Sequence, residues 1–457
     1  MRLIFAGLVV AAASARAQAV LVNGPEGRQA DSVLAAAAAA GFSGVALIVH
    51  NGDVVLRRGY GLANRADTIA FEPSTLVQIG SNTKDFTAVA ILQLVERGKL
   101  SLDDSIPRFF SGVPLDKAGI TIRQLMRHTA GFPLGVGGDF EPIGREALIT
   151  RVLHTPLESK PGDRERYSNV GFSLLAAIIE KVSGQSYDQY VWDNIITPLG
   201  LHDTGYLLPH FDPRRLAHGY LAGTDQGTML TRGHLADGHY WNLRGNGGMI
   251  STVEDMATFY NALFDTERLL RTATREARFP KDQPLILAGS DRVNFFMFHR
   301  APRARLEIYL ASTTAEAQAP AVHQRLARIF GLDADGPRPT GRPAGAKTIE
   351  FPATPLGQAA ATWFQAFNDG DVNTRTVLFT ERMLPSPGDT RTPAERARAM
   401  AAMRGNLGRI APYKFKAESP TRATIDFDTT GGDVGTIVLE IEDAAPHRVK
   451  SFRLSIG

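Results

Sequence analysis

Apolar and polar residues follow two different patterns along this chain. Near the N-terminus, residues 45–49 form a short apolar run, Asn51-Gly52 follows it, and residues 54–56 begin a second apolar run. An Asn-Gly pair between two such runs is typical of a type I′ turn, so residues 44–60 are predicted to form a β-hairpin. Strand-like runs return at residues 295–298 and 306–311, with a turn between them, which predicts a second pair of strands.

Between these strands the apolar residues recur at helical spacing. Residues 85–98 are predicted to form a helix that is buried on most sides and ends at Gly98. Further helices are predicted at residues 121–128, 171–182 and 322–330. Strands at both ends of a mostly helical stretch predict a single sheet flanked by helices, with a helical insertion.

The composition changes after residue 332. Residues 336–343 read Gly-Pro-Arg-Pro-Thr-Gly-Arg-Pro, which is typical of a semi-extended linker that packs poorly. Two helices and four strands are predicted beyond it, at residues 356–367, 392–407, 413–417, 423–427, 434–441 and 449–454. We therefore predict a main domain over residues 20–332, a linker over 333–348 and a small α+β domain over 349–457.

The first residues have the pattern of a secretory signal peptide. Arg2 precedes an apolar run over residues 3–13, and small residues follow at Ala15, Ala17 and Ala19. This pattern predicts cleavage within residues 1–19 and a periplasmic or secreted protein. A membrane anchor is not expected, because the run is too short to span a bilayer and the chain of 457 residues has no cysteine for lipid attachment.

Charge and composition exclude some classes of partner. The chain is 44% hydrophobic and 21% charged, as soluble globular proteins are, and its net charge is only +3 without a basic stripe. No nucleic-acid partner is therefore expected. The 11 histidines have no metal-ligand spacing, so neither a metal nor another cofactor is predicted. The oligomeric state stays open.

The head of the helix at residues 85–98 carries the first chemical signal. Ser81 and Lys84 are three residues apart, so they share one face of a helical turn. A serine hydroxyl needs a neighbouring base to act as a nucleophile, and a desolvated lysine can supply it. The alternative is a serine that caps the helix beside a surface lysine.

The second signal is Tyr167-Ser168-Asn169, after a Pro-Gly turn. Next to a lysine ammonium the phenolate form of Tyr167 is expected to be favoured, so that it can act as a base. Asn169 offers both a donor and an acceptor to a substrate amide. The alternative is a loop tyrosine that only packs.

Taken together, these motifs resemble the serine β-lactamase-like family, which includes class C β-lactamases, D-alanyl-D-alanine carboxypeptidases and related esterases. Residues 121–133 and 247–252 are similar to the same family, and the resemblance covers about residues 41–332. It implies a β-lactamase/transpeptidase-like fold, in which an antiparallel sheet is flanked by helices and an all-helical insertion, with the active site between them. A small-molecule acyl substrate is implied as well.

The resemblance also implies roles for individual residues. Ser81 would be the nucleophile that forms an acyl-enzyme, Lys84 and Tyr167 would share the acid and base work, and Asn169 would bind substrate. The third family motif aligns with Leu287-Ala288-Gly289-Ser290. There Gly289 lets substrate lie along the strand, and the Ser290 N–H would be an oxyanion donor beside the N–H of Ser81.

Leu287 departs from this third motif, because the family carries a cation at that place. The departure favours a neutral ester over a β-lactam or a D-alanyl peptide, unless Lys281 or Arg292 supplies the charge instead. A catalytically weakened binding or sensor protein is the alternative to an enzyme. Beyond the linker, the helical start with Trp363 resembles cystatin/NTF2-like domains.

Overall fold

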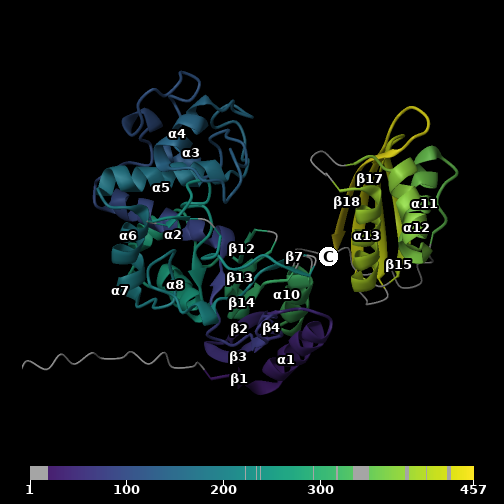
Figure 1. Ribbon diagram of the computed structural model, residues 1–457, viewed down its shortest axis with the longest axis horizontal. Coiled ribbons are helices and arrows are strands. Elements are labelled where there is room, and N and C mark those ends of the chain that lie inside the picture. Colours follow the sequence, from purple (N-terminus) through teal and green to yellow (C-terminus); the bar gives the residue numbers. More distant parts are fainter. Residues whose placement is uncertain are drawn as a thin grey trace, which may run out of the picture. The chain divides into compact units, whose positions relative to one another are not determined.

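The computed structural model describes residues 19–456, apart from residues 222, 233, 237, 292, 315–317, 333–348, 386–390, 408 and 430–433 (Figure 1). The predicted signal peptide therefore lies outside the described residues, except for Ala19, and so does the predicted linker. The chain divides into two compact units, one up to Leu332 and one after it. Each unit is described by itself.

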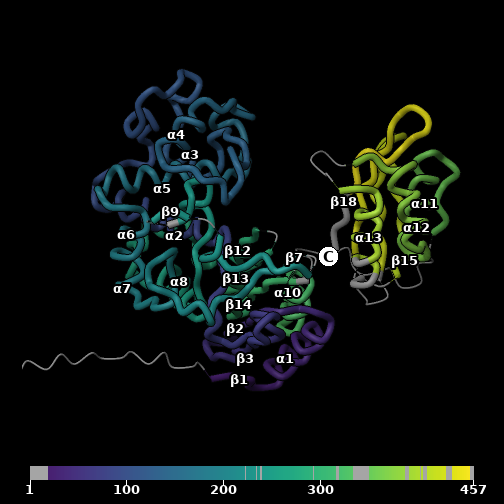
Figure 2. Tube along the Cα trace, in the orientation of Figure 1, coloured from purple at the N-terminus to yellow at the C-terminus, as the bar shows by residue number. Residues whose placement is uncertain are grey.

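A six-stranded antiparallel sheet is the centre of the first unit. Its strands run in the order β1-β3-β2-β14-β13-β12. They are β1 (Leu21–Val22), β2 (Gly44–His50), β3 (Asp53–Tyr60), β12 (Leu285–Ser290), β13 (Phe295–Ala301) and β14 (Leu306–Ser312). Figure 2 shows how the N-terminal purple strands meet the strands that follow the helical region. The sheet therefore joins the two ends of the unit.

The hairpin between β2 and β3 forms as predicted. Asn51 and Gly52 both have positive φ, at 57° and 91°, as a type I′ turn requires. The turns between β12, β13 and β14 keep the remaining strands in register, with Gly289 opposite Phe296 and Phe298 opposite Tyr309.

The two faces of the sheet carry two separate cores, because side chains along a strand alternate between faces. Ala46 and Ile48 of β2 face α1 (Gly24–Ala39) and α10 (Gln318–Ile329). Val45 and Leu47 face the larger core under the helical region. The two layers of helices lie on opposite sides of the sheet in Figure 1.

The helical region lies between β3 and β12 in the chain. Its helices are α2 (Thr83–Glu96), α3 (Ile122–Met126), α4 (Arg145–His154), α5 (Asn169–Ser183), α6 (Tyr187–Val191), α7 (Thr197–Leu199), α8 (Val253–Asp265) and α9 (Thr272–Glu276). The 3₁₀ turns are η1 (Gly80–Asn82), η2 (Ile106–Arg108), η4 (Pro213–Arg215) and η5 (Pro302–Ala304), and η3 (Trp192–Ile196) is a π turn. This architecture confirms the predicted fold class.

The predicted helices are confirmed with small shifts at their ends. The helix of residues 85–98 begins two residues earlier, at Thr83, and Gly98 follows it with a φ of 67°. Thr121 caps α3 by accepting the Gln124 N–H, and Gln124 bonds back to the Thr121 N–H. Short pairs of strands complete the region: β4 (Leu62–Asn64) with β5 (Ile69–Ala70), β6 (Val77–Gln78) with β11 (Ile250–Ser251), β7 (Tyr220–Leu221) with β8 (Thr224–Asp225), and β9 (His234–Leu235) with β10 (Gly238–His239).

The second unit contains helices followed by an antiparallel sheet, in the order that the sequence predicts. Its helical part comprises α11 (Pro355–Asp369), α12 (Val372–Val377), the π turn η6 (Leu378–Arg382) and α13 (Pro393–Leu407). The strands are β15 (Ile410–Ser419), β16 (Arg422–Thr429), β17 (Val434–Ile441) and β18 (Val449–Ile456), and neighbours in this list pair. Trp363 and Phe367 of α11 stack in its core.

Candidate active site

Ser81 lies in η1, directly before α2, where two backbones approach each other closely. Gly80 has a φ of 52°, which disfavours any residue with a side chain. A Cβ atom on Gly80 would lie 2.6 Å from the carbonyl carbon of Gly289, and a Cβ atom on Gly289 would lie 2.3 Å from the Ser81 nitrogen. The end of β12 therefore lies directly against the Ser81 turn.

Lys84 is buried beneath Ser81 in the first turn of α2. Its Nζ donates hydrogen bonds to Ser81 Oγ at 3.0 Å and to the carbonyl oxygen of Asn246 at 2.6 Å. Burial lowers the pKa of Lys84 to about 7, although the carboxylates of Asp85 and Asp139 act in the opposite direction. A large fraction of Lys84 is thus neutral at physiological pH, as a general base must be.

Tyr167 approaches Ser81 from the opposite side. Its hydroxyl donates to Ser81 Oγ at 2.7 Å, and Lys84 Nζ lies 4.9 Å from the centre of its ring. Burial raises the pKa of Tyr167, and the hydrogen bond to Ser81 only partly offsets this rise. The expectation that the lysine favours the phenolate is therefore wrong, because desolvation of the oxygen and the charge of Asp85 both raise this pKa. The hydroxyl keeps its proton at neutral pH.

The loop after α3 holds the Tyr167 segment in place. His128 has a φ of 56°, and its ring packs against Tyr167 at a centroid distance of 4.6 Å. The Arg166 N–H donates to the His128 carbonyl, and the Ser168 hydroxyl donates to the carbonyl of Pro133 at 2.7 Å. These contacts hold residues 121–133 against residues 167–169.

Asn169 is not brought into the same hydrogen-bond network. It is the first residue of α5, and its side chain lines a small cavity with Asp139 and Asn242. Its Oδ1 atom is buried, and no described residue donates a hydrogen bond to it. A buried acceptor without a donor is costly unless a ligand or water satisfies it.

The third motif lies on β12, at the predicted register. Leu287 points to the same side as Gly289 and packs partly buried against the larger core. Ala288 and Ser290 are on the opposite, exposed side, while the Ser290 nitrogen would lie 2.7 Å from a Cβ atom on Gly80. Lys281 is exposed, and Arg292 lies outside the described residues.

Sequence reasoning missed a buried polar group behind Lys84. Asn82 Nδ2 donates to the Tyr260 hydroxyl at 2.8 Å, and that hydroxyl donates to Asp85 Oδ2 at 2.8 Å. Burial raises the pKa of Asp85 to about 6. No local signal in the sequence identifies Tyr260, because it lies on α8, far from Lys84 along the chain. Asp85, by contrast, is the residue directly after Lys84.

Arg278 was missed as well. Its Nε atom is buried and has no hydrogen-bond partner among the described residues. Burial, together with the charges of Lys84 and Arg278, lowers the pKa of His128 to about 4. The charge of Arg278 also opposes the rise in the pKa of Asp85. Besides Lys84, Arg278 is therefore a second positive charge that shifts the pKa values of groups near Ser81.

Over the described ranges, no group of three or more metal-ligating side chains converges. A search of the same residues finds no helix that is both long and apolar enough to cross a membrane.

This fold, with a serine and a lysine on one helical turn and a tyrosine opposite, is that of the β-lactamase-fold serine hydrolases. A sequence profile of the family described as Beta-lactamase matches residues 30–299, and the chain belongs to this family. The resemblance stated from the motifs is thereby confirmed for the first unit.

Among curated proteins, the chain is similar to penicillin-binding proteins of Bacillus subtilis (strain 168). It is 28% identical to penicillin-binding protein 4* over 269 residues, which are 56% of this chain and 58% of that one. It is 33% identical to the putative penicillin-binding protein PbpX over 225 residues, 49% of this chain and 56% of that one. The chain thus spans little more than half the length of these relatives.

Solved structures with the same fold include a penicillin binding protein from Bacillus halodurans, with a TM-score of 0.54, 25% identity and coverage of 66% of this chain and 99% of that one. EstCE1, a hydrolase with promiscuous acyltransferase activity, has a TM-score of 0.56, 21% identity and coverage of 67% and 98%. The octameric penicillin-binding protein homologue from Pyrococcus abyssi has a TM-score of 0.56 at 22% identity, and covers 91% of each chain.

Proposed function

We propose that this protein is a secreted or periplasmic serine hydrolase that forms an acyl-enzyme on Ser81 and acts on a small ester, amide or lactam. The supporting observation is that Ser81 Oγ accepts hydrogen bonds from Lys84 Nζ at 3.0 Å and from the Tyr167 hydroxyl at 2.7 Å. Export is part of the proposal and rests on the pattern of residues 1–19 alone.

In the acylation step, neutral Lys84 accepts the Ser81 proton while Ser81 Oγ attacks the carbonyl carbon of the substrate. Tyr167 donates to Ser81 Oγ, which leaves the serine's own hydrogen free to point at Lys84. The pKa of Lys84, about 7, suits this transfer, because a base works best when its pKa lies near the working pH.

The negative charge of the tetrahedral intermediate develops where the Ser81 turn meets β12. The backbone N–H groups of Ser81 and Ser290 are proposed to donate to this oxyanion, and the close approach of Gly80 and Gly289 brings the two segments together. When the carbon–leaving group bond breaks, the proton held by Lys84 passes to the leaving group, with the Tyr167 hydroxyl as the relay. Water then attacks the acyl-enzyme by the same route in reverse.

The proposal is tested by labelling with a fluorophosphonate, followed by mass mapping of the modified residue. The label is expected on Ser81 alone, and Ser81→Ala is expected to abolish labelling while the melting curve stays unchanged. Ser168→Ala is the matched control, because Ser168 lies one residue from Tyr167 but bonds to the carbonyl of Pro133. Label on Ser168 or Ser251 in the wild type would contradict the mechanism.

Leu287 supports a preference for neutral esters. The carboxylate of a β-lactam or D-alanyl peptide needs a cation, and a hydrogen bond to a charged group contributes about 1.5–3 kcal/mol, or roughly 10–150-fold in kcat/KM. Leu287 offers no donor and packs into the core. A short neutral ester makes no such demand.

The test compares a p-nitrophenyl ester with a chromogenic cephalosporin in wild type, Leu287→Lys and Arg278→Met. The wild type is expected to prefer the ester, and the lysine variant to gain on the cephalosporin. If the wild type prefers the cephalosporin and the Arg278→Met variant loses this preference, Arg278 supplies the cation instead. Labelling of Ser81 without turnover of either substrate would favour a sensor protein.

A further inference from the structure

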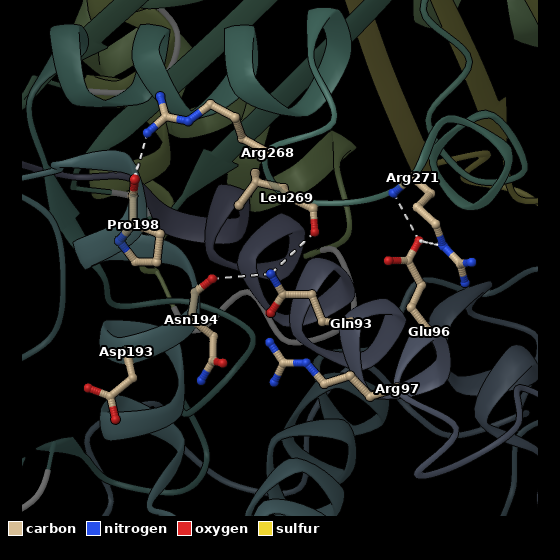
Figure 3. A pocket seen from close by; sticks show the side chains of 9 residues that line it. All are labelled: Gln93, Glu96, Arg97, Asp193, Asn194, Pro198, Arg268, Leu269 and Arg271. Carbon is tan, nitrogen blue, oxygen red and sulfur yellow. Dashed lines mark hydrogen bonds and ion pairs between the residues drawn. The ribbon is translucent and has the colours of Figure 1, made fainter.

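A second pocket lies at the other end of α2 from Ser81 (Figure 3). The helix has 14 residues, so the two sites are about 20 Å apart at a rise of 1.5 Å per residue. The pocket has a volume of about 520 Å³, and pockets of roughly 300–1,000 Å³ hold small ligands. Its lining is polar: Gln93, Glu96, Arg97, Asp193, Asn194, Pro198, Arg268, Leu269 and Arg271.

Three arginines surround this pocket, and two of them have no carboxylate partner. Arg97 donates to the Tyr190 hydroxyl at 3.2 Å, and Arg268 donates to the carbonyl of Pro198 at 2.6 Å. Neither forms an ion pair with any residue that the structure describes. Arg271, by contrast, lies 3.5 Å from Glu96. The lining also contains the carboxylate of Asp193, so its three guanidinium groups and two carboxylates leave a formal net charge of +1.

Gln93 lies at the centre of the pocket, with the arginines around it (Figure 3). Its side chain is 94% buried, and its Nε2 donates to the carbonyls of Asn194 at 3.1 Å and Leu269 at 3.3 Å. These two bonds fix the orientation of the amide. Its Oε1 atom is then a buried acceptor that receives no hydrogen bond from the part of the chain that is described. Buried acceptors are nearly always satisfied, so a donor on a bound ligand would complete the hydrogen bonds of this amide.

We propose that this pocket binds a small anion, a carboxylate or a phosphate, that also carries an O–H or N–H donor. Guanidinium groups recognise both kinds of anion through paired N–H donors, which accounts for Arg97 and Arg268. The donor of the ligand would satisfy Gln93 Oε1. The inference does not depend on the chemistry of Ser81, because none of the lining residues belongs to the candidate active site.

The ligand class is tested by calorimetric titration of the full chain at constant ionic strength, since exposed charges are screened by salt. Two matched pairs of probes distinguish the anion and the donor. Citrate is compared with tricarballylate, which has the same carboxylates but no hydroxyl. At a pH where both are dianions, glycerol 3-phosphate is compared with propyl phosphate, which lacks the hydroxyls. Tighter binding of the hydroxyl-bearing member of at least one pair is expected, and the pair that binds identifies carboxylate or phosphate.

Substitutions of pocket residues test whether the probes bind in this pocket. Arg97→Gln and Arg268→Gln each remove one guanidinium and are expected to weaken the bound probe by about tenfold or more. Arg214→Gln is the matched control, because its side chain is 85% exposed and lies outside the pocket lining. It is expected to leave the affinity unchanged.

Three outcomes would overturn the proposal. The first is that none of the four probes binds saturably at millimolar concentration. The second is that Arg214→Gln weakens binding as much as the two pocket variants do, which would indicate a general charge effect. The third is equal affinity within both probe pairs, which would show that Gln93 Oε1 takes no part. Melting temperatures of the three variants, measured without probe, separate loss of binding from loss of fold.

Discussion

The environment of one side chain, Lys84, decides what the candidate active site can do. Its ammonium form has the Ser81 hydroxyl and one carbonyl oxygen as neighbours, and no described carboxylate bonds to it directly. Burial without a direct ion pair favours the neutral amine. The same burial keeps the Tyr167 hydroxyl protonated. These pKa shifts support the roles that we propose, with Lys84 as the base and Tyr167 as the proton donor.

The pH dependence of acylation follows from this assignment. Only neutral Lys84 accepts a proton, so the rate of fluorophosphonate labelling should rise with pH and level off above the pKa of about 7. The charge of Asp85 raises the pKa of Lys84, so Asp85→Asn is expected to move the midpoint to lower pH. A wild-type rate that rises tenfold per pH unit through pH 9 would instead indicate a lysine with its ordinary pKa.

Removal of the Tyr167 hydroxyl should slow acylation without affecting the fold. Tyr167→Phe keeps the ring that packs on His128 and deletes the donor to Ser81, so the labelling rate is expected to fall by about 10²–10⁴-fold. Tyr220→Phe is the control, because its hydroxyl accepts from the Arg65 backbone instead. Equal labelling rates in wild type and Tyr167→Phe would make Tyr167 a packing residue.

For individual residues, the sequence predicted those contacts that depend on the local spacing of residues. Ser81 and Lys84 are three residues apart, and their hydrogen bond follows from one turn of helix. The protonation state of Tyr167 could not be predicted, because it depends on burial by segments far away in the chain. Asn169 was assigned by resemblance, and its role in binding stays a prediction.

At the scale of elements, the contact between η1 and β12 positions Ser81. Gly80 and Gly289 allow the two backbones to approach to a distance at which a side chain would clash. The resemblance to the family implied this contact, because the family carries its third motif on the strand beside the nucleophile. It could not indicate how close the approach is, because the two elements are separated by the whole helical region.

A methyl group at this contact should disturb both stability and activity. Gly289→Ala places a Cβ atom 2.3 Å from the Ser81 nitrogen and 2.5 Å from the Ile79 oxygen. Overpacking of this kind typically costs about 1–3 kcal/mol in the free energy of unfolding. We expect a lower melting temperature and strongly reduced labelling of Ser81.

Gly119→Ala is the control for that substitution, because no atom outside the neighbouring residues lies within 4 Å of its added methyl. Its stability and labelling should match the wild type. If Gly289→Ala behaved like this control, the backbone of β12 would not restrict the Ser81 turn.

At the scale of the whole molecule, each of the two units has its own core residues, and residues 333–348 separate the two sets along the chain. The cores of the first unit draw on residues up to Leu332, and the core of the second begins at Phe351. Apolar runs predicted β2, β3, β13 and β14 of the first unit and the four strands of the second. The resemblance of the second unit to cystatin/NTF2-like domains stays a prediction, because helices followed by a four-stranded sheet are common to many folds.

The predicted domain boundaries are tested by truncation. A chain that ends at residue 335 should melt cooperatively and label on Ser81 at the wild-type rate, because it keeps every residue of the first unit's cores. Residues 349–457, made separately, should also melt cooperatively. Insoluble or non-cooperative products would show that the two units need each other to fold.

The topology of the six-stranded sheet determines the order in which its strands can pair during synthesis on the ribosome. β2 pairs with β3 on one side and with β14 on the other, yet β14 is synthesised only after the entire helical region. Until then the nascent hairpin has an unpaired edge and exposes both Ala46 and Ile48 on one face and Val45 and Leu47 on the other. We therefore expect an unfinished chain to be prone to pair with other nascent chains until β14 has been made.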